Sequence, residues 1–187
     1  MQLEEKTSRR QAAIFQAVTE ALFECEYHQL TIEDIAARAG VGKSTIYRWW
    51  KHKSELVLET FRAHTASVFE LDSTQSLEDN LVQQLSRLAE ALNHPLGRAL
   101  LVVMANHREL AGDFFHHFLL PRRKQMHALL QKSVERGEIR ADYPFDLMLD
   151  SLYGPIHYKI IFFNRMPDEA YIRALVALAL QPVHIQA

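Results

Sequence analysis

The sequence predicts an all-α protein in which a small three-helix domain, residues 1–54, precedes a larger helical domain, residues 55–187. Three observations predict this fold class. Apolar residues recur at helical spacing through almost the whole chain, two short helical patterns meet at a glycine-containing turn near residues 39–42, and no convincing strand or internal repeat occurs. Hydrophobic residues make up 48% of the 187, so the chain can bury a sizeable core, and we expect about nine helices.

Composition sets outer limits on the class of protein. The formal net charge is −2, and Cys25 is the only cysteine, so no internal disulfide is possible. The sequence shows no signal peptide, and no apolar run approaches the roughly 18 residues that a membrane span needs. We therefore expect a cytoplasmic protein without a membrane partner.

The first expected helix is amphipathic, and the second has clear start and stop signals. Thr31 followed by Asp34 has the spacing of a capping box, which predicts a helix start. Gly40 predicts the end of this helix, because glycine adopts the left-handed conformation at the least cost. The apolar stripe of the first helix consists of Ile14, Ala17, Val18, Ala21 and Leu22.

The helix after the turn has two unlike faces. At about 100° per residue, Ile46 and Trp50 share one face, whereas the opposite face centres on Arg48. Residues 35–54 contain five basic side chains and no acidic one. A short helix that is apolar inside and small and basic outside suits the major groove of DNA, although an ordinary helical hairpin with a solvated basic face has the same pattern. The residues beside and flanking Arg48 are Ser44, Thr45, Tyr47 and Trp49.

Residues 30–56 resemble the amino-terminal domain of the tetracycline-repressor (TetR) family. The resemblance covers about the first third of the chain, and the rest agrees in length and helical layout. Two positions depart from the family pattern. Glu26 stands where a glycine usually closes the first helix, and a left-handed Glu26 would cost roughly 1 kcal/mol. Gly42 stands where a serine often begins the recognition helix. The matching positions are Leu30, Thr31, Ile35, Ala36, Ala39, Gly40, Val41, Ser44, Thr45, Ile46, Tyr47, Trp50, Lys53, Ser54, Glu55 and Leu56.

The resemblance implies a sequence-specific DNA-binding regulator. The simplest form is a ligand-responsive repressor that binds a palindromic double-stranded operator as a dimer and is released by a small molecule. Thr31, Tyr47 and Lys53 are then expected to contact phosphates. The residues expected to face the major groove are Lys43, Ser44, Thr45, Arg48 and Trp49.

The larger domain is expected to be a series of helices with recognisable boundaries. A long helix over residues 54 to about 71 follows the first domain. Ser76 begins a second capping box, and Pro95 suits the first position of a helix. Gly112 is expected to interrupt the helix that Pro95 begins, and Gly137 to close the longer helix after it.

The last two expected helices, about residues 145–164 and 169–180, are the most apolar. The first of them has almost no polar face, and a helix that is apolar all round must be covered on all sides. We expect two subunits to form a four-helix interface here, as the family does, although burial in the core of one subunit is the alternative. The candidate interface residues are Leu147, Ser151, Tyr158, Ile161, Ile172, Leu175, Val176 and Ala179.

The resemblance also implies a pocket for a small effector among the middle helices. Aromatic, methionine and histidine side chains there would suit a flat or apolar ligand held by a few polar contacts. Taken singly, each of these residues more often packs a core. The candidate lining residues are Phe61, His64, Met104, His107, Phe114, Phe118, Met126, Tyr153, His157 and Phe162.

Three further patterns do not predict a site. Gly42-Lys43-Ser44 ends like a phosphate-binding loop, but Ala37 replaces its first glycine and no apolar strand precedes it. The histidines lack metal-ligand spacing, and no nucleophile and base are spaced for catalysis, so we expect no metal, no cofactor and no enzyme. The basic run at residues 122–124 is expected to be a solvated face.

Two alternatives to the ligand-responsive repressor stay open. A DNA-binding regulator without a small-molecule effector would have a body packed too tightly to admit a ligand. A helical enzyme would leave the acid-free basic segment of residues 35–54 unexplained.

Overall fold

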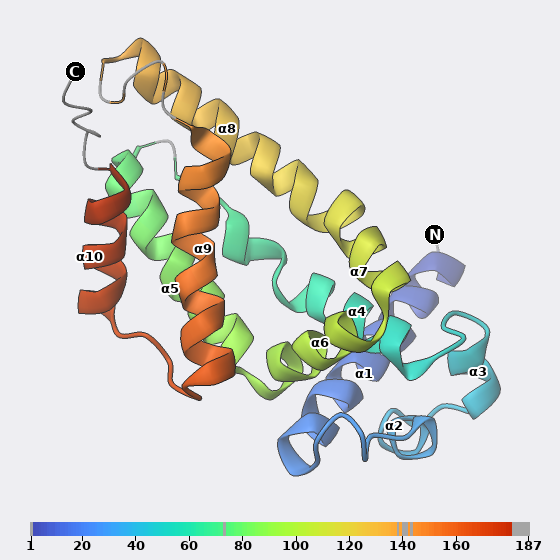
Figure 1. Ribbon diagram of the computed structural model, residues 1–187. Helices are drawn as coiled ribbons and strands as arrows, with labels where there is room; N and C mark the ends of the chain where they lie inside the picture. Colours follow the sequence, from blue (N-terminus) through green and yellow to red (C-terminus); the bar gives the residue numbers. More distant parts are fainter. Residues whose placement is uncertain (1, 73, 138, 140–141, 143, 181–187) are drawn as a thin grey trace. The chain divides into compact units, whose positions relative to one another are not determined.

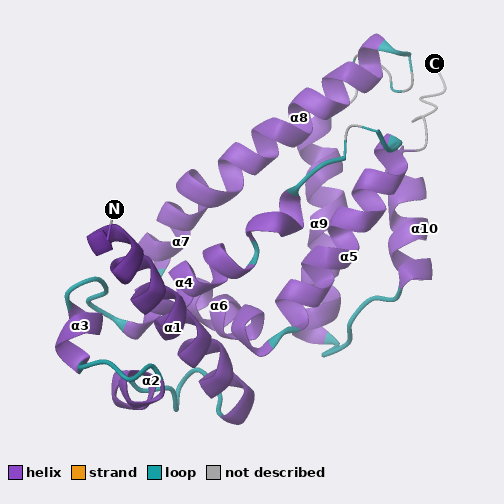
Figure 2. Cartoon of the chain, turned by 180° about the vertical axis from the view of Figure 1, so that it is seen from behind, coloured by secondary structure: helices purple, strands orange, loops and turns teal. Residues whose placement is uncertain are grey.

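The computed structural model describes residues 2–72, 74–137, 139, 142 and 144–180, with side chains from residue 7 onward. These residues form ten α-helices, one 3-10 helix and one π-helix, and no strand occurs among them (Figure 1). Figure 2 shows the same helices from behind. The predicted all-α fold class is confirmed.

The chain divides into two compact units, and each is discontinuous in sequence. The first contains Met1–Ala66 and His94–Phe114, and the second contains Ser67–Asn93 and Phe115–Ala187. The helix expected after residue 54 belongs to the first compact unit. The boundaries of the two units therefore differ from the predicted division into residues 1–54 and 55–187. The predicted division concerns function, and it stays a prediction.

The first unit is built around α1, which packs against α2, α4 and α6. The apolar stripe predicted for α1 is buried along its whole length, as its helical spacing requires. Helix α4 also packs against α6, and α6 against α7. The helices of this unit are α1 (Gln2–Glu24), α2 (Ile32–Arg38), α3 (Lys43–Tyr47), α4 (Lys53–His64), α6 (Pro95–Asn106) and α7 (Arg108–Phe114).

Local signals set the ends of the short helices. The Thr31 hydroxyl accepts the Asp34 N–H at 3.2 Å and caps α2, as predicted. Gly40 has φ 63° at the turn after α2, a conformation that glycine adopts without strain. Glu26 is not left-handed, so the expected strain does not arise. Its carbonyl instead accepts the N–H groups of Gln29 and Leu30 in a right-handed turn after α1.

The second unit consists of helices that pack against α5 (Leu77–Asn93). Helices α5, α9 (Phe145–Phe162) and α10 (Glu169–Leu180) lie side by side (Figure 1), and α5 also contacts α8 (Leu120–Glu135). The remaining elements are the 3-10 helix η1 (Ala66–Phe69) and the π-helix η2 (Phe115–Leu119). The buried apolar residues of α5 and α9 form most of the core: Leu77, Leu81, Val82, Leu85, Leu88, Ala89, Leu92, Met148, Leu149, Leu152, Ile156 and Ile160.

Several predicted boundaries are confirmed in both units. Ser76 caps α5 by accepting the Asp79 N–H at 3.0 Å, and its hydroxyl donates to the Asp79 carboxylate at 2.7 Å. Pro95 is the first residue of α6. Gly137 follows α8 with φ 72°.

Two predicted boundaries are wrong. The long helix expected to reach about residue 71 ends at His64, where Thr65 leaves the helical conformation, and a 3-10 helix follows. Gly112 does not interrupt its helix. The break falls at His107, with φ −127° and ψ 84°, and Gly112 lies inside α7. Glycine costs a helix only about 1 kcal/mol, so it weakens a helix without ending it.

The half-buried Tyr153 and the buried Gln84 form a polar pair between α9 and α5. The Tyr153 hydroxyl donates to the Gln84 side-chain oxygen at 2.6 Å, and burial raises the pKa of Tyr153 to about 12.

Tyr153→Phe should lower the free energy of unfolding by about 1–3 kcal/mol, because the buried Gln84 oxygen loses this donor. Urea denaturation measures the change. The double variant Tyr153→Phe/Gln84→Leu should lose less than the two single variants together, and simple additivity would contradict the pairing.

Candidate DNA interface

The short helix α3 is held to the first unit by its inner face. Ile46 is fully buried and Trp50 is 3% exposed, which confirms the inward face expected from the spacing. The Trp50 indole N–H donates to the Glu59 carboxylate of α4. The Trp50 ring also lies 5.7 Å from that of Phe15 on α1, measured between centroids. A five-residue helix cannot persist alone, so these contacts fix its position.

The outward face of α3 carries the residues expected to meet DNA. Ser44 and Arg48 are exposed, Thr45 is half-buried, and Tyr47 is 50% exposed. The Arg48 guanidinium lies 5.5 Å from the centroid of the Trp49 ring, at cation–π distance. These side chains are accessible to a ligand as large as DNA, and their individual roles stay predictions.

Lys43 begins α3 and is paired with an acidic residue of α2. Its ammonium lies 3.0 Å from the Glu33 carboxylate. This contact raises the pKa of Lys43 and lowers the pKa of Glu33. Both side chains are more than half exposed, so the pair is weak and solvent-screened, and Lys43 can exchange Glu33 for another acceptor.

Of the basic residues in this region, Arg38 is the one most completely neutralised by carboxylates. It donates to both oxygens of Glu24 at 2.9 and 2.6 Å, and to Asp34 at 2.8 Å. The segment that is acid-free in sequence is therefore flanked by carboxylates in space. Among its five basic residues, Arg38 and Lys43 form ion pairs, whereas Arg48, Lys51 and Lys53 form none within the part of the chain that the structure describes.

The structure gives Lys53 a role that the sequence did not predict. Its ammonium donates to the carbonyls of Tyr27, His28 and Leu30 at 2.9, 3.2 and 2.8 Å. It also lies 4.8 Å from the centroid of the Tyr27 ring. An ammonium has three N–H donors, and all three are used here. Lys53 is thus a tie between α4 and the turn after α1, and the expected phosphate contact stays a prediction.

Gly42 leaves the start of α3 without a side-chain cap. It occupies the N-cap position with φ −73° and ψ 145°, which any residue can adopt. A serine at this position could accept a first-turn N–H, whereas glycine cannot. The departure from the family pattern therefore changes the capping of α3 and not its backbone.

The ten candidate effector residues are divided equally between the two units. Phe61 and Phe114 are buried in the first unit, and Phe118 and Met126 are buried in the second. Phe162 is 74% exposed on α9 and lies outside any core. Three candidates are half-buried, Met104, Tyr153 and His157, and two are exposed, His64 and His107.

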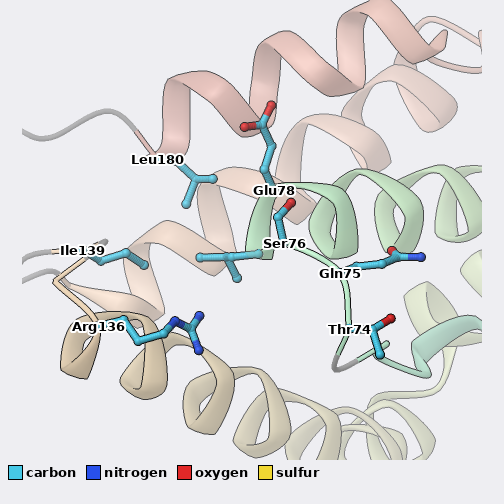
Figure 3. Close-up of a pocket in the computed structure, with 8 residues that line it drawn as sticks. Thr74, Gln75, Ser76, Glu78, Arg136, Ile139 and Leu180 are labelled. Carbon is cyan, nitrogen blue, oxygen red and sulfur yellow. The ribbon is translucent and has the colours of Figure 1, made fainter.

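Two recesses lie elsewhere on the units. One of about 470 Å³ lies beside the start of α5, and Figure 3 shows Arg136 and Ile139 on its α8 side with Leu180 across from them. Another of about 500 Å³ lies between α1 and α4 and includes Phe15 and Arg62. None of the ten candidates lines either recess, so the effector site stays a prediction.

The candidate dimer residues of α9 are exposed in the single chain, whereas most of those on α10 are buried in it, and the interface itself stays a prediction. Leu147 is 65% exposed, and Ser151, Tyr158 and Ile161 are also exposed. On α10, which packs against α5 and α9, Leu175 is half-buried. The other three α10 candidates are corrected, because they belong to the core of the second unit and have almost no surface left for a partner: Ile172 (1% exposed), Val176 (0%) and Ala179 (8%).

Only part of the basic run at residues 122–124 is the solvated face that the sequence predicted: Lys124 is exposed, whereas Arg122 and Arg123 are half-buried. The Arg122 guanidinium lies 3.6 Å from the centroid of the Phe118 ring. Arg123 binds Asp146 and Asp150 at 2.9 and 2.8 Å, which ties α8 to α9. The two Arg123 contacts bridge residues 23 and 27 positions apart in sequence, and helical spacing gives no signal for them.

Among the described residues, no group of three or more histidine, cysteine, aspartate or glutamate side chains is placed to hold a metal ion. None of the described helices combines the length and apolar character that spanning a membrane requires.

A basic, outward-facing recognition helix on a helical body defines a helix-turn-helix regulator. The family model described as "Bacterial regulatory proteins, tetR family" matches residues 14–60. The model described as "Tetracyclin repressor-like, C-terminal domain" matches residues 71–179. The chain belongs to the TetR family of DNA-binding transcriptional regulators, which are not enzymes, and the resemblance found in the sequence is confirmed.

Individual relatives agree with this assignment over nearly their whole lengths. An uncharacterized HTH-type transcriptional regulator of Mycobacterium bovis is 32% identical over 94% of this chain and 88% of its own. A DNA-binding transcriptional repressor, TetR, of Mycobacteroides abscessus is 29% identical over 89% of this chain and 90% of its own. The crystal structure of a TetR family transcription regulator matches with a TM-score of 0.73 and 27% identity, over 93% of this chain and 98% of the other.

The Lys53 tie predicts a stability effect. Lys53→Met should lower the free energy of unfolding by about 1–3 kcal/mol, because three carbonyls lose a charged donor. Thermal denaturation followed by circular dichroism measures the loss. Lys51→Met is the matched control, since Lys51 is exposed, and it should stay within about 0.5 kcal/mol of the parent. If Lys53→Met left stability unchanged but weakened DNA binding, the result would favour a phosphate contact by Lys53 over the structural tie.

Proposed function

We propose that the protein is a repressor that binds a palindromic operator as a homodimer and releases it when a small molecule binds. The observation that carries the proposal is the outward face of α3, where Arg48 is exposed and has no ion pair among the described residues. Such a side chain on a helix anchored only from behind is suited to the major groove.

Five of the eight candidate residues have a specific chemical role in this proposal. Arg48 and Lys43 donate to the O6 and N7 atoms of guanine, and Lys43 exchanges Glu33 for the base. The Thr45 methyl group contacts a thymine methyl. Thr31 and Tyr47 donate their hydroxyl protons to phosphates, which fixes the orientation of the first unit on the duplex.

The exposed face of α9 supports the homodimer. Exposed residues, most of them apolar, recur along it at helical spacing and form a solvent-exposed stripe among the described residues. A second copy would cover the stripe with the same residues, and the two-fold axis would place two recognition helices on two half-sites. The stripe consists of Leu147, Ser151, Gly154, Tyr158, Ile161 and Phe162.

The effector is the least specified part of the proposal. The buried candidates Phe61, Phe114, Phe118 and Met126 would supply apolar surface, and Tyr153 would supply a hydroxyl. Ligand binding must favour one arrangement of the DNA-binding units over another to change operator affinity. Bound over a promoter in the cytoplasm, the dimer would exclude polymerase and so repress. A regulator without an effector is the second candidate, favoured by the involvement of these side chains in packing.

Selection of binding sites from a randomised DNA pool tests the proposal. Purified protein at moderate salt should enrich a palindrome whose half-sites lie about one helical turn apart. Binding that depends on salt but enriches no sequence would contradict sequence-specific recognition.

Arg48 should carry base preference. Arg48→Ala should cost about 1–3 kcal/mol of operator binding and relax the preference at one position of each half-site. Fluorescence anisotropy with matched and mismatched operators measures both effects. Lys51→Ala is the control, because an exposed lysine outside α3 should weaken all sequences alike and reduce the salt slope by about one. Equal losses on every operator for both variants would contradict the division of roles.

The α9 stripe should hold the dimer together. Ile161→Glu should raise the dimer dissociation constant at least about tenfold, because it places an unpaired carboxylate inside an apolar interface. Analytical ultracentrifugation measures the constant. Val102→Glu is the control, since Val102 is an exposed apolar residue of α6, outside the stripe. An unchanged dissociation constant for Ile161→Glu would show that the subunits associate elsewhere.

A further inference from the structure

Helix α6 begins with a histidine cap. His94 occupies the N-cap position with φ −60° and ψ 146°, and its Nδ1 atom accepts the Leu96 N–H at 3.2 Å. Pro95 between them has no N–H to offer. The usual cap residues, serine, threonine, aspartate and asparagine, accept at any neutral pH. A histidine accepts through Nδ1 only while that nitrogen carries no proton.

A second histidine lies against this cap. The ring of His64, the last residue of α4, is 5.4 Å from the His94 ring between centroids. On the α1 side, Phe23 presents its ring at 4.9 Å, edge to face. Protonation of His94 would therefore lose the Leu96 bond, place a cation at a helix amino terminus and bring it close to His64.

Among the described residues, His94 has no carboxylate partner, and the influences on its ionisation are burial and the neighbouring His64. The last turn of α4 contains Arg62 besides His64, and the first turn of α6 contains no acidic residue and is followed by Arg98. Helix α7 begins about 18 Å along the axis of α6, where Arg108 and Glu109 lie, and its Asp113 is paired with Arg62 of α4 at 3.5 Å. On α1, Glu24 binds Arg38, whereas Glu20 is hydrogen-bonded to the neutral side chain of Gln16 and keeps its charge. On α5, Glu90 is exposed four residues before His94.

The histidine pair lies where the chain passes between the two compact units. The units are joined after residues 66, 93 and 114. His94 is the first residue after the second of these crossings, and His64 lies two residues before the first unit ends at Ala66. Helix α6 in turn packs against α1 and α4, which carry the DNA-binding elements of the first unit. A change at the start of α6 therefore reaches the helices that position α3.

We propose that His94 and His64 form a proton-operated switch, in which protonation of His94 removes the cap of α6, loosens its first turn and weakens operator binding. The effect on the operator rests on the proposed function, whereas the effect on the cap does not. The ligand that operates the switch is the proton, and the bistable element is the amino terminus of α6.

The sign of the pH dependence follows from the surroundings of His94. Burial lowers the pKa of His94 from its ordinary value of 6.5, and the charge on His64 lowers it further. The folded protein therefore binds this proton less readily than the unfolded chain does. The stability linked to His94 is fully present above about pH 6.5 and is lost as the pH falls through the lower pKa of the folded state.

The cap is tested with His94→Asn, which keeps a side-chain acceptor but does not titrate. Between pH 7.5 and 5.5, the melting temperature of the parent should fall by about 2–4 °C more than that of the variant. Amide hydrogen exchange, corrected for its intrinsic pH dependence, should show loss of protection at residues 96–98 in the parent alone. His52→Asn is the matched control, because His52 occupies the N-cap of α4 without a side-chain bond, and it should behave as the parent does. The same pH response in His94→Asn as in the parent would overturn the proposal.

The coupling is tested with His64→Asn and with the operator. An NMR titration of the His94 ring should show its midpoint below 6.5 and move upward in His64→Asn, and an unmoved midpoint would contradict the pairing. Operator affinity should fall at least about threefold more from pH 7.5 to 5.5 in the parent than in His94→Asn. Equal falls would overturn the switch. Absence of operator binding at every pH would instead contradict the proposed function. The effect of pH on operator affinity would then fall with it, whereas the loss of the α6 cap on protonation of His94 would still stand.

Discussion

The anchoring of α3 is the constraint on which the DNA-binding surface depends. Five residues are too few to sustain a helix alone, so α3 is held in place by the packing of Ile46 and Trp50 in the core of the first unit. The Trp50 indole reaches Glu59, and Lys53 ties the start of α4 to the carbonyls that follow α1. Because these anchoring contacts are made by the inner face of α3 and by residues that follow it, the side chains of its outer face are not needed to hold the helix in place. That separation lets the outer residues vary with the operator while the fold stays the same.

Acidic residues restrain the charge of this surface. Glu24 and Asp34 neutralise Arg38, and Glu33 pairs with Lys43, in a chain whose formal net charge is only −2. Sequence-independent attraction to DNA grows with the number of free cations, so this arrangement limits it. In the proposed dimer, affinity must then come from a few well-placed contacts and from the second subunit. A regulator that has to leave its operator benefits from such a balance, because fewer phosphate contacts have to be broken.

The sequence predicted those parts of the fold that depend on near neighbours. Caps at Thr31 and Ser76, the turn at Gly40 and the inner face of α3 all follow from spacings of three or four residues, and all are present. The Lys53 tie spans more than twenty residues and was missed. Helical periodicity alone also could not tell which apolar face of α10 turns toward α5, since both faces are apolar. Long-range pairing, and not local propensity, decides these features.

Each crossing between the two units coincides with a departure from the α-helix. The first falls in the 3-10 helix η1, the second at the cap of α6 and the third at the start of the π-helix η2. A continuous α-helix resists bending, whereas 3-10 and π segments have poorer hydrogen-bond geometry and often mark hinges or functional sites. The chain thus places its least regular backbone where one unit passes into the other. A signal that passes along the chain from one unit to the other has to cross one of these three short segments. The segment at His94 is the one whose hydrogen bond a single proton can remove.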